Sequence, residues 1–219
     1  MTGQLIDLSH DIVDGMTTHP GIPGPRISTF LSHAQSAARY APGTTFEIAR
    51  IDMVANTGTY LDMPAHRFAG APDLGTLALE RLAGVPGVVL DLDGHGGAIE
   101  PADLDLAAAR ERAVLVRTGW DRNWGTPAYL GANPFLTEAA SRALVEAGAA
   151  LIGIDSLNVD SLADGRRPAH TVLLRAGLPL VEHLTGLGAL PASGFRFFAV
   201  PPRISGMATF PVRAFAIVG

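Results

Sequence analysis

The chain has 219 residues, of which 47% are hydrophobic and 17% are charged, and its formal net charge is -5 at pH 7. This composition excludes a disordered chain and predicts one globular domain over residues 1–219. The negative charge argues against nucleic acid or an anionic membrane as a partner, and the absence of cysteine excludes disulfide bonds and thiolate chemistry. There is no signal-peptide pattern and no apolar run near ~20 residues, so we expect a cytoplasmic protein without a membrane span.

The first part of the chain is predicted to consist of short strands and loops. Residues 5–8 form a first strand, and residues 15–25 form a loop rich in glycine and proline. Residues 27–41 fit either a short strand or a helical turn. Residues 45–54 are rich in β-formers and are expected to be a strand, whereas residues 74–82 have apolar residues spaced for a short helix.

Strands and a few helices alternate in the second part of the chain. Residues 85–87 are predicted to be a turn before an apolar run. Strands are expected at residues 88–92, 114–118, 151–154, 179–183, 195–200 and 215–218. Helices are expected at residues 101–106, at residues 138–147 after the capping Thr137, and from Pro168 to Gly177. Many short strands with few helices indicate a mixed α/β fold.

The polar stretch at residues 56–66 is the most informative part of the sequence. It follows a predicted strand and combines a bend at Gly58 with the polar residues Asn56, Thr57, Thr59, Tyr60, Asp62 and His66. Junctions between strands and loops are common positions for functional side chains. Asp62 and His66 suit metal ligation or proton transfer. The alternative is a structural turn in which Asp62 caps local amides and His66 is a surface residue.

Other polar residues have both a functional and a structural interpretation. Residues 155–160 follow a predicted strand, which is a frequent location for a site and also an ordinary strand end. Glu182 follows His170 by twelve residues and lies among apolar residues, where burial is unfavourable unless the carboxylate is paired or binds a cation. His10 and His19 are single histidines in polar loops, for which solvated loop residues are the favoured interpretation.

The stretch at residues 56–66 resembles the signature of the cyclase family of metal-dependent hydrolases, which includes bacterial kynurenine formamidase and isatin hydrolase. The family pattern is His-x-Gly-Thr-His-x-Asp-x-Pro-x-His, and this chain matches it at Gly58, Thr59, Asp62, Pro64 and His66. Asn56 and Tyr60 stand where the family has two metal-binding histidines. Further segments resemble the family at residues 7–10, 118–121 and 201–213, so the resemblance covers nearly the whole chain.

The resemblance implies a swivelling β/α/β fold with a β-rich core flanked by helices, and a homodimer or homotetramer with sites near subunit contacts. In the two-zinc members, one metal is bound by the two signature histidines and the aspartate. The other is bound by that aspartate with a later histidine and glutamate. Here the second set is intact, as Asp62, His170 and Glu182, whereas the first is reduced to the aspartate. The resemblance therefore implies one divalent metal, zinc or manganese, or none.

The implied activity is metal-assisted hydrolysis of a small-molecule substrate, namely an amide, formamide or lactone. His66 is expected to act as general base and then acid, because an imidazole pKa suits both tasks. Tyr60 is expected to donate a hydrogen bond to the developing oxyanion. The residues expected to border the substrate are Asn56, Thr59, His19 and Trp120, with Trp124 as an alternative to Trp120.

Two other functions are compatible with the sequence. The first is a metal-independent cyclase or dehydratase acting on a polyketide-like or hydroxy-acid substrate. The second is an inactive homologue that binds a small molecule, which the loss of both signature histidines favours. Metal content separates the metal-dependent hydrolase from both alternatives.

Overall fold

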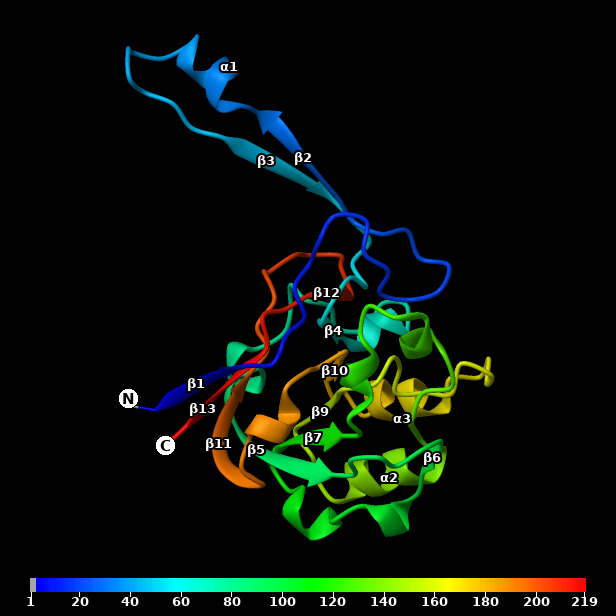
Figure 1. Ribbon diagram of the computed structural model, residues 1–219. Coiled ribbons are helices and arrows are strands. Elements are labelled where there is room, and N and C mark those ends of the chain that lie inside the picture. Colours follow the sequence, from blue (N-terminus) through cyan, green and yellow to red (C-terminus); the bar gives the residue numbers. More distant parts are fainter. Residues whose placement is uncertain (1–2) are drawn as a thin grey trace.

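A nine-stranded sheet that curls on itself forms the body of the protein (Figure 1). The computed structural model describes residues 3–219, and its strands follow the order β1-β13-β11-β5-β7-β9-β10-β4-β12. In that order their bounds are Gln4–Asp7, Phe215–Val218, Ser193–Phe198, Ala83–Asp91, Ala113–Arg117, Leu151–Ile154, Leu180–Glu182, Tyr60–Asp62 and Thr209–Pro211. The predicted mixed α/β fold with a β-rich core is confirmed.

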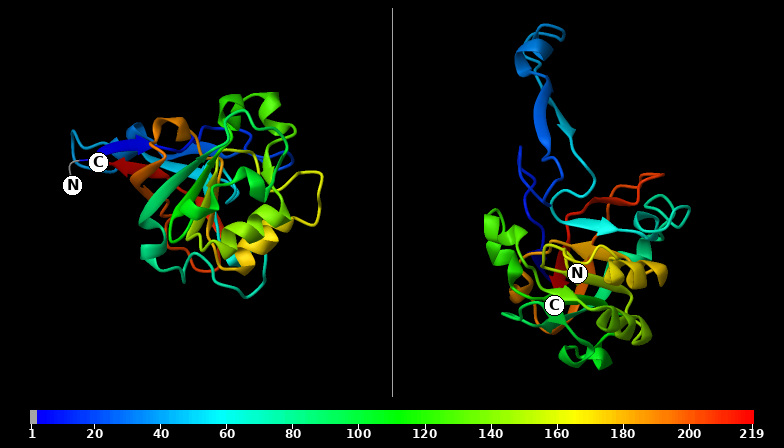
Figure 2. Two further views of the ribbon diagram at one scale, coloured as in Figure 1. Left: turned by 90° about the horizontal axis from the view of Figure 1, so that it is seen from below. Right: turned by 90° about the vertical axis from the view of Figure 1, so that its right-hand side faces the viewer.

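The centre of the sheet is parallel and buried on both faces. β5, β7, β9 and β10 pair in parallel, and all four residues of β9 are buried, so its sequence is continuously apolar rather than alternating. α2 (Glu138–Glu146) and α3 (Pro168–Arg175) pack on one face of these strands (Figure 2). The other face is filled by a second apolar cluster that includes Leu115, Val181 and Phe197.

Both helices of the body lie where the sequence predicts them. The hydroxyl of Thr137 caps α2 by accepting a hydrogen bond from the amide of Ala140 at 3.1 Å. Gly148 follows α2 with a φ of +79°, a left-handed conformation that glycine adopts without strain. Pro168 is the first residue of α3, as its fixed φ and missing amide proton favour. β9 and β13 also have their predicted bounds.

Two predicted helices are replaced by 3₁₀ turns. Within residues 74–82, the amide of Leu74 donates to the carbonyl of Met207 at 2.9 Å. This contact ties the segment to a distant part of the chain, and only the short turn Leu79–Arg81 is helical. Residues 101–106 likewise begin with a turn at Pro101–Asp103 and run into a second turn at Leu106–Ala108.

The predicted turn at residues 85–87 is also wrong, because β5 continues through it. β11 pairs with Gly87 and Pro86 through Phe195 and Arg196, between two register shifts. A Cβ atom at Gly87 would lie 2.0 Å from the ring of Phe195. The glycine therefore permits a close packing contact inside the sheet and does not mark a turn.

A two-stranded ribbon projects from the body (Figures 1 and 2). We call residues 26–52 the arm; it contains β2 (Arg26–Leu31), α1 (His33–Ala37) and β3 (Ile48–Asp52). Residues 27–41, for which a strand and a helical turn were alternatives, contain both. The arm exposes large apolar side chains at Ile27, Phe30, Tyr40, Ile48 and Ile51.

Two further strands, β6 (Ala98–Ile99) and β8 (Phe135–Leu136), form a separate parallel pair beside α2. Among residues 3–219, no helix is both long enough and apolar enough to span a membrane.

Candidate active site

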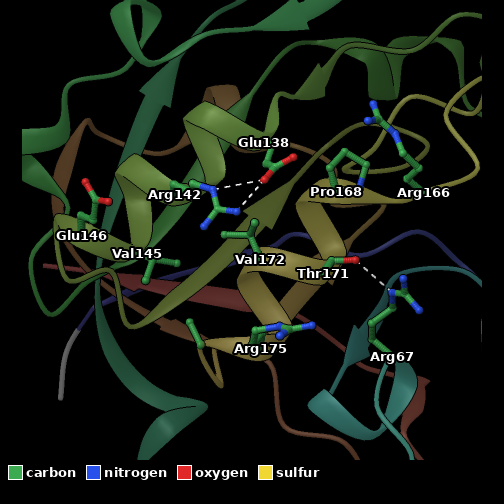
Figure 3. Close-up of a pocket in the computed structure, with 11 residues that line it drawn as sticks. Arg67, Glu138, Arg142, Val145, Glu146, Arg166, Pro168, Thr171, Val172 and Arg175 are labelled. Atoms are coloured by element: carbon green, nitrogen blue, oxygen red, sulfur yellow. Dashed lines mark hydrogen bonds and ion pairs between the residues drawn. The ribbon is translucent and has the colours of Figure 1, made fainter.

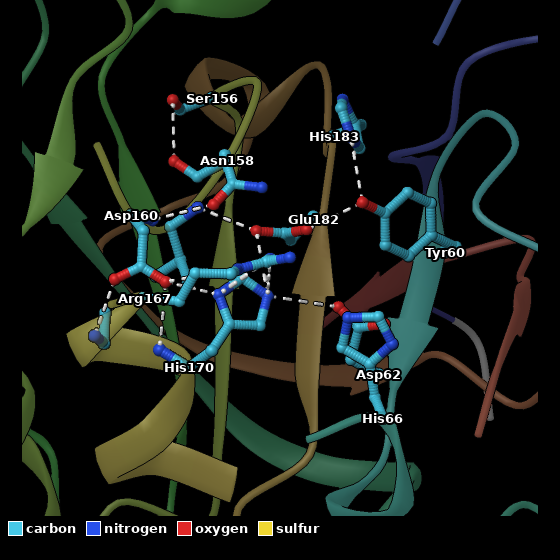
Figure 4. Close-up of polar contacts among 12 residues, drawn as sticks. Tyr60, Asp62, His66, Ser156, Asn158, Asp160, Arg167, His170, Glu182 and His183 are labelled. Atoms are coloured by element: carbon cyan, nitrogen blue, oxygen red, sulfur yellow. Dashed lines mark hydrogen bonds and ion pairs between the residues drawn. The ribbon is translucent and has the colours of Figure 1, made fainter. Parts of the chain in front are cut away.

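Two neighbouring antiparallel strands place the predicted carboxylates on one face of the sheet. β4 pairs with β10 in a register that sets Tyr60 opposite Glu182. Directly opposite residues share a face, and so do alternate residues along one strand, so the side chain of Asp62 joins them. α3 brings His170 to the same place (Figure 4). His66 follows on a 3₁₀ turn after β4.

The imidazole of His170 lies at the centre of this group. Its Nε2 atom is 3.6 Å from Asp62 Oδ2 and 3.7 Å from Glu182 Oε1. Its Nδ1 atom is 2.6 Å from a carboxylate oxygen of Asp160, which can only accept, so Nδ1 carries a proton and donates it. In the neutral ring the Nε2 lone pair therefore faces the other two carboxylates. A metal-binding imidazole needs this tautomer and this kind of orienting partner.

The surroundings of His170 attract positive charge. Arg167 Nη2 lies 2.8 Å from the Nε2 atom and donates to it. Burial disfavours a charged ring, but the neighbouring carboxylates outweigh burial and raise the pKa of His170 to about 9. The lone pair of His170 Nε2 can either accept the hydrogen bond from Arg167 or bind a proton. The negative charge of the carboxylates favours both of these arrangements.

Asp62 is buried, and within residues 3–219 neither of its carboxylate oxygens has a hydrogen-bond partner. Burying an ionised carboxylate in this way is strongly unfavourable unless a cation compensates it. Asp62, His66 and His170 each offer one ligand atom, and these atoms lie within 4.8 Å of one another. Carboxylate and imidazole ligands suit zinc and manganese. The residues present therefore fit a divalent metal, with Glu182 beside them.

Tyr60 contacts the opposite side of Glu182. Its hydroxyl donates to Glu182 Oε2 at 2.7 Å, and the amide of Val159 donates to Oε1 at 2.7 Å. Burial, reinforced by the negative charge of Glu182, raises the pKa of the Tyr60 phenol well above its ordinary value. The residue that replaces a signature histidine is therefore a neutral hydrogen-bond donor at neutral pH.

An aromatic cluster lies next to Tyr60. His183 is buried, with its Nδ1 atom 2.8 Å from the hydroxyl of Tyr129 and its Nε2 atom 3.4 Å from the hydroxyl of Tyr60. The ring of Trp124 stacks on His10 at a centroid distance of 3.9 Å and meets Tyr129 edge-on at 4.8 Å. Burial lowers the pKa of His10 to about 4, so this stacked imidazole is neutral at neutral pH.

The four predicted substrate contacts are held mainly by protein groups. Asn56 Oδ1 accepts from Thr209 at 3.2 Å. The buried hydroxyl of Thr59 accepts from the amide of His10 at 3.0 Å and donates to the carbonyl of His183. The Nε1 atom of Trp120 donates a hydrogen bond to the backbone carbonyl of Tyr129. The Nδ1 atom of His19 donates to the backbone carbonyl of Pro20. Their roles toward a substrate stay predictions.

Two cavities lie near this region. One, of about 470 Å³, is lined by residues 11–17 of the amino-terminal loop and by residues 124–130, including Trp124 and Tyr129. The other, of about 630 Å³, lies between α2, α3 and Arg67 and is rich in arginine (Figure 3). None of the predicted catalytic or metal-binding residues lines either cavity, but the first is bordered by Trp124 and Tyr129 of the aromatic cluster beside Tyr60, whereas in the second Arg142 is paired with Glu138 at 2.6 Å. The first cavity is therefore the better candidate for a substrate.

Sequence reasoning missed three residues of the site. Asp160 lies within the polar run at residues 155–160, but its contact with His170 depends on how α3 packs. Arg167 precedes the predicted helix and has a left-handed φ of +51°, which no local signal indicated. Tyr129 lies on a 3₁₀ turn in a segment that gave no clear pattern. The structure also brings in His183, the residue after Glu182, which is buried beside Tyr60.

Comparisons with known proteins agree with this geometry. The family model described as "Putative cyclase" matches residues 6–161. Kynurenine formamidase of Polaromonas naphthalenivorans is 31% identical over 177 residues, which cover 80% of this chain and 76% of that protein. A solved structure of a "potential metal-dependent hydrolase with cyclase activity" is 26% identical, has a TM-score of 0.79, and aligns over 98% of this chain and 97% of its own. Isatin hydrolase A from Labrenzia aggregata shares the fold, with a TM-score of 0.84 at 22% identity over 98% of this chain and 93% of its own.

The chain belongs to the cyclase family. The prediction of a hydrolase of this family is confirmed, because its relatives are hydrolytic enzymes. The family match ends before His170 and Glu182. It is the fold that brings these two residues to the signature aspartate.

Proposed function

We propose that the protein is a metal-dependent hydrolase of a small amide, formamide or lactone, and that it binds one zinc or manganese ion through Asp62, His170 and Glu182. The observation that carries the proposal is the buried Asp62 carboxylate, which has no hydrogen-bond partner within the described chain and faces the Nε2 atom of His170. Three protein ligands leave a position for water, as a catalytic metal requires. The names of the relatives, a formamidase and an isatin hydrolase, support an amide-type substrate.

A metal in this position supplies a bound water of lowered pKa and polarises the substrate carbonyl. His66 is suited to move the proton, because its Nδ1 atom is 3.8 Å from Asp62 Oδ1 and its side chain is 23% exposed. We assign it the roles of base toward the attacking water and acid toward the leaving nitrogen or oxygen. The hydroxyl of Tyr60 keeps its proton and becomes a donor to the oxyanion when it turns from Glu182.

The cavity beside Trp124 is the proposed substrate pocket. Its volume of about 470 Å³ falls in the range of small-molecule sites. Trp124 and Tyr129 give it an aromatic wall. Asn56, Thr59, His19 and Trp120 do not line the cavity, and they are proposed to reach a substrate at its edge or to brace the loops that form it.

We also propose that the protein is cytoplasmic and forms a homodimer or homotetramer, and the arm supports the proposed assembly. A two-stranded ribbon alone is marginally stable in water, and the arm exposes five large apolar side chains on and around its strands. Exposed apolar groups that are contiguous mark interaction surfaces. A second copy of this chain is the proposed partner, because sites of this family are expected near subunit contacts.

Turnover on a panel of aryl formamides, cyclic amides and lactones tests the proposal. The protein is stripped with a chelator and assayed before and after addition of zinc or manganese, alongside Asp62→Asn. We expect metal-dependent turnover in the wild type and none in the variant. The matched control is Asp105→Asn, which alters an exposed aspartate outside the site and is expected to keep full activity. Equal turnover with and without metal contradicts the proposal.

A further inference from the structure

Three buried side chains form a hydrogen-bonded chain next to the candidate metal site. Tyr129 is 1% exposed, His183 is fully buried and Tyr60 is 3% exposed. The chain runs from the Tyr129 hydroxyl to His183 Nδ1 at 2.8 Å, and from His183 Nε2 to the Tyr60 hydroxyl at 3.4 Å. It ends at Glu182 Oε2, 2.7 Å from the Tyr60 hydroxyl. The chain therefore joins the aromatic cluster to a metal-binding carboxylate.

The chemistry of the groups fixes the direction of every bond in this chain. An ionised Glu182 can only accept, so the hydroxyl proton of Tyr60 points to it. The remaining capacity of the Tyr60 oxygen is as an acceptor, so His183 Nε2 must donate. Within residues 3–219 the hydroxyl of Tyr129 has no other hydrogen-bond partner. Its proton is therefore satisfied only if His183 Nδ1 accepts it. One tautomer of His183, protonated at Nε2 and bare at Nδ1, satisfies all four groups.

His183 has a left-handed backbone conformation that residues other than glycine rarely adopt. Its φ is +57°, one of three such values at non-glycine residues in the described chain. Such a conformation is unfavourable and persists only where the surroundings enforce it. The hydroxyl of Thr59 donates to the carbonyl of His183, and the next amide, that of Leu184, donates to Ile154 at 3.0 Å. These contacts turn the ring toward Tyr60 rather than toward solvent.

The geometry points to His183 and Tyr129 as positioning residues that hold the Tyr60 proton on Glu182 Oε2 in the site without substrate. This inference rests on the proposed metal site for its consequence. Oε2 is occupied by a hydroxyl donor, while Oε1 accepts from the amide of Val159 and faces His170 at 3.7 Å. Glu182 thus offers one side to a cation, and a neutral donor fills the other. The chain Tyr129–His183–Tyr60 takes over, on that side, the charge compensation that a second cation would give.

Nitrogen-15 NMR of the histidine rings in metal-free protein tests the direction of the chain. The His183 signals are assigned by their loss in His183→Asn, since asparagine tolerates a positive φ. We expect a protonated Nε2 and a bare Nδ1. A proton on Nδ1 overturns the inference, whether or not Nε2 is also protonated. Because no metal is present, this result is independent of whether the proposed hydrolase activity exists.

The affinity for zinc, measured by competition with a chelating dye, tests the consequence. Tyr129→Phe removes one hydroxyl and preserves the aromatic ring. Groups that orient a metal ligand typically contribute 10–100-fold to affinity, and we expect zinc to bind about tenfold more weakly. Tyr40→Phe, which alters an exposed tyrosine of the arm, is the matched control and should bind as the wild type does. Wild-type affinity in Tyr129→Phe overturns the inference. Absence of zinc binding in the wild type refutes the metal site itself, and the NMR result alone then tests the direction of the hydrogen bonds from Tyr129 to Glu182.

Discussion

The two sides of Glu182 differ in how their polar groups are satisfied. On the Tyr60 side, hydroxyl and imidazole groups satisfy each other through bonds of fixed direction. On the Asp62 side, two buried carboxylate oxygens have no hydrogen-bond partner in residues 3–219, and the imidazoles of His170 and His66 lie 3.6 Å and 3.8 Å from them. The contrast indicates that a cation belongs on the Asp62 side alone. Tyr60, in place of a signature histidine, creates the difference.

The largest expected effect comes from His66, which touches only the Asp62 side. His66→Gln should lower kcat by about 10²–10⁴-fold, the usual contribution of a general base. Metal content should not change, because His66 is not among the three proposed ligands. Steady-state kinetics and metal analysis of the same preparation check both points. His95→Gln, at a half-exposed histidine outside the site, should behave as the wild type, and a loss of metal in His66→Gln would show that His66 is a ligand.

Removing the Tyr60 hydroxyl should reduce the stability of the fold and, because the oxyanion donor is lost, also the turnover. Tyr60→Phe leaves a buried carboxylate oxygen of Glu182 and the Nε2 proton of His183 without partners. An unsatisfied buried group costs about 1–3 kcal/mol, so we expect the free energy of unfolding to fall by about that amount. Urea unfolding monitored by tryptophan fluorescence measures it. An unchanged midpoint would mean that the Tyr60 side is not satisfied in the way described.

Restoring the two signature histidines would give the Tyr60 side of Glu182 metal-binding groups like those on the Asp62 side. Replacing Asn56 and Tyr60 together by histidine restores the imidazoles that the two-zinc pattern requires. We expect the doubly substituted protein to bind two metals per chain where the wild type binds one. Zinc titration followed by calorimetry gives the stoichiometry. One metal per chain in the double variant would mean that other differences also set the number of metals.

A substitution in the arm tests whether the arm joins two copies of this protein. Ile51→Lys places a charge among the exposed apolar side chains of the arm, and loss of a buried apolar anchor commonly weakens an interface by more than 1 kcal/mol. Analytical ultracentrifugation should show a shift from oligomer toward monomer. Glu47→Lys, at an exposed polar position of the arm, is the control. A wild type that is already monomeric at all concentrations would refute the proposed assembly.

The smallest expected effect is a pH dependence of stability from His10. Its folded-state pKa is lowered to about 4, mainly by burial against the opposing charges of Asp121 and Asp11. The unfolded chain therefore takes up a proton near pH 6.5 before the folded chain does. This contribution to stability is complete above pH 6.5 and is lost as the pH falls toward 4. Since the ring is partly exposed, we expect about 1–2 kcal/mol.

Other groups titrate in the same range, so a variant is needed to isolate His10. Asp155 has its pKa raised to about 6 by burial, and its contribution changes in the opposite direction, since a neutral carboxyl is favoured in the fold. His10→Phe preserves the stacking on Trp124 and removes the titration. The difference in unfolding free energy between wild type and variant should grow between pH 4 and pH 6.5 in favour of the wild type. A difference independent of pH would contradict the assignment.

The family resemblance predicted the proposed metal ligands Asp62, His170 and Glu182, while packing determined their surroundings. The sequence predicts β10 and α3, whereas residues 60–62 lie in a stretch expected to be a loop and instead form β4, which pairs with β10 and β12. The contacts of Asp160 and Tyr129 join segments far apart in the sequence, so no local pattern contains them. The helix expected at residues 74–82 failed for the same reason, since a hydrogen bond to Met207 replaced its first turn.

The number of metal ions bound per chain tests the central claim most directly. Wild type and Asp62→Ala are purified without chelator and measured by inductively coupled plasma mass spectrometry. The site described here predicts about one zinc or manganese ion per chain in the wild type and none in the variant. Two ions per chain would contradict the role of Tyr60, and no ion after incubation with zinc or manganese would contradict the metal site.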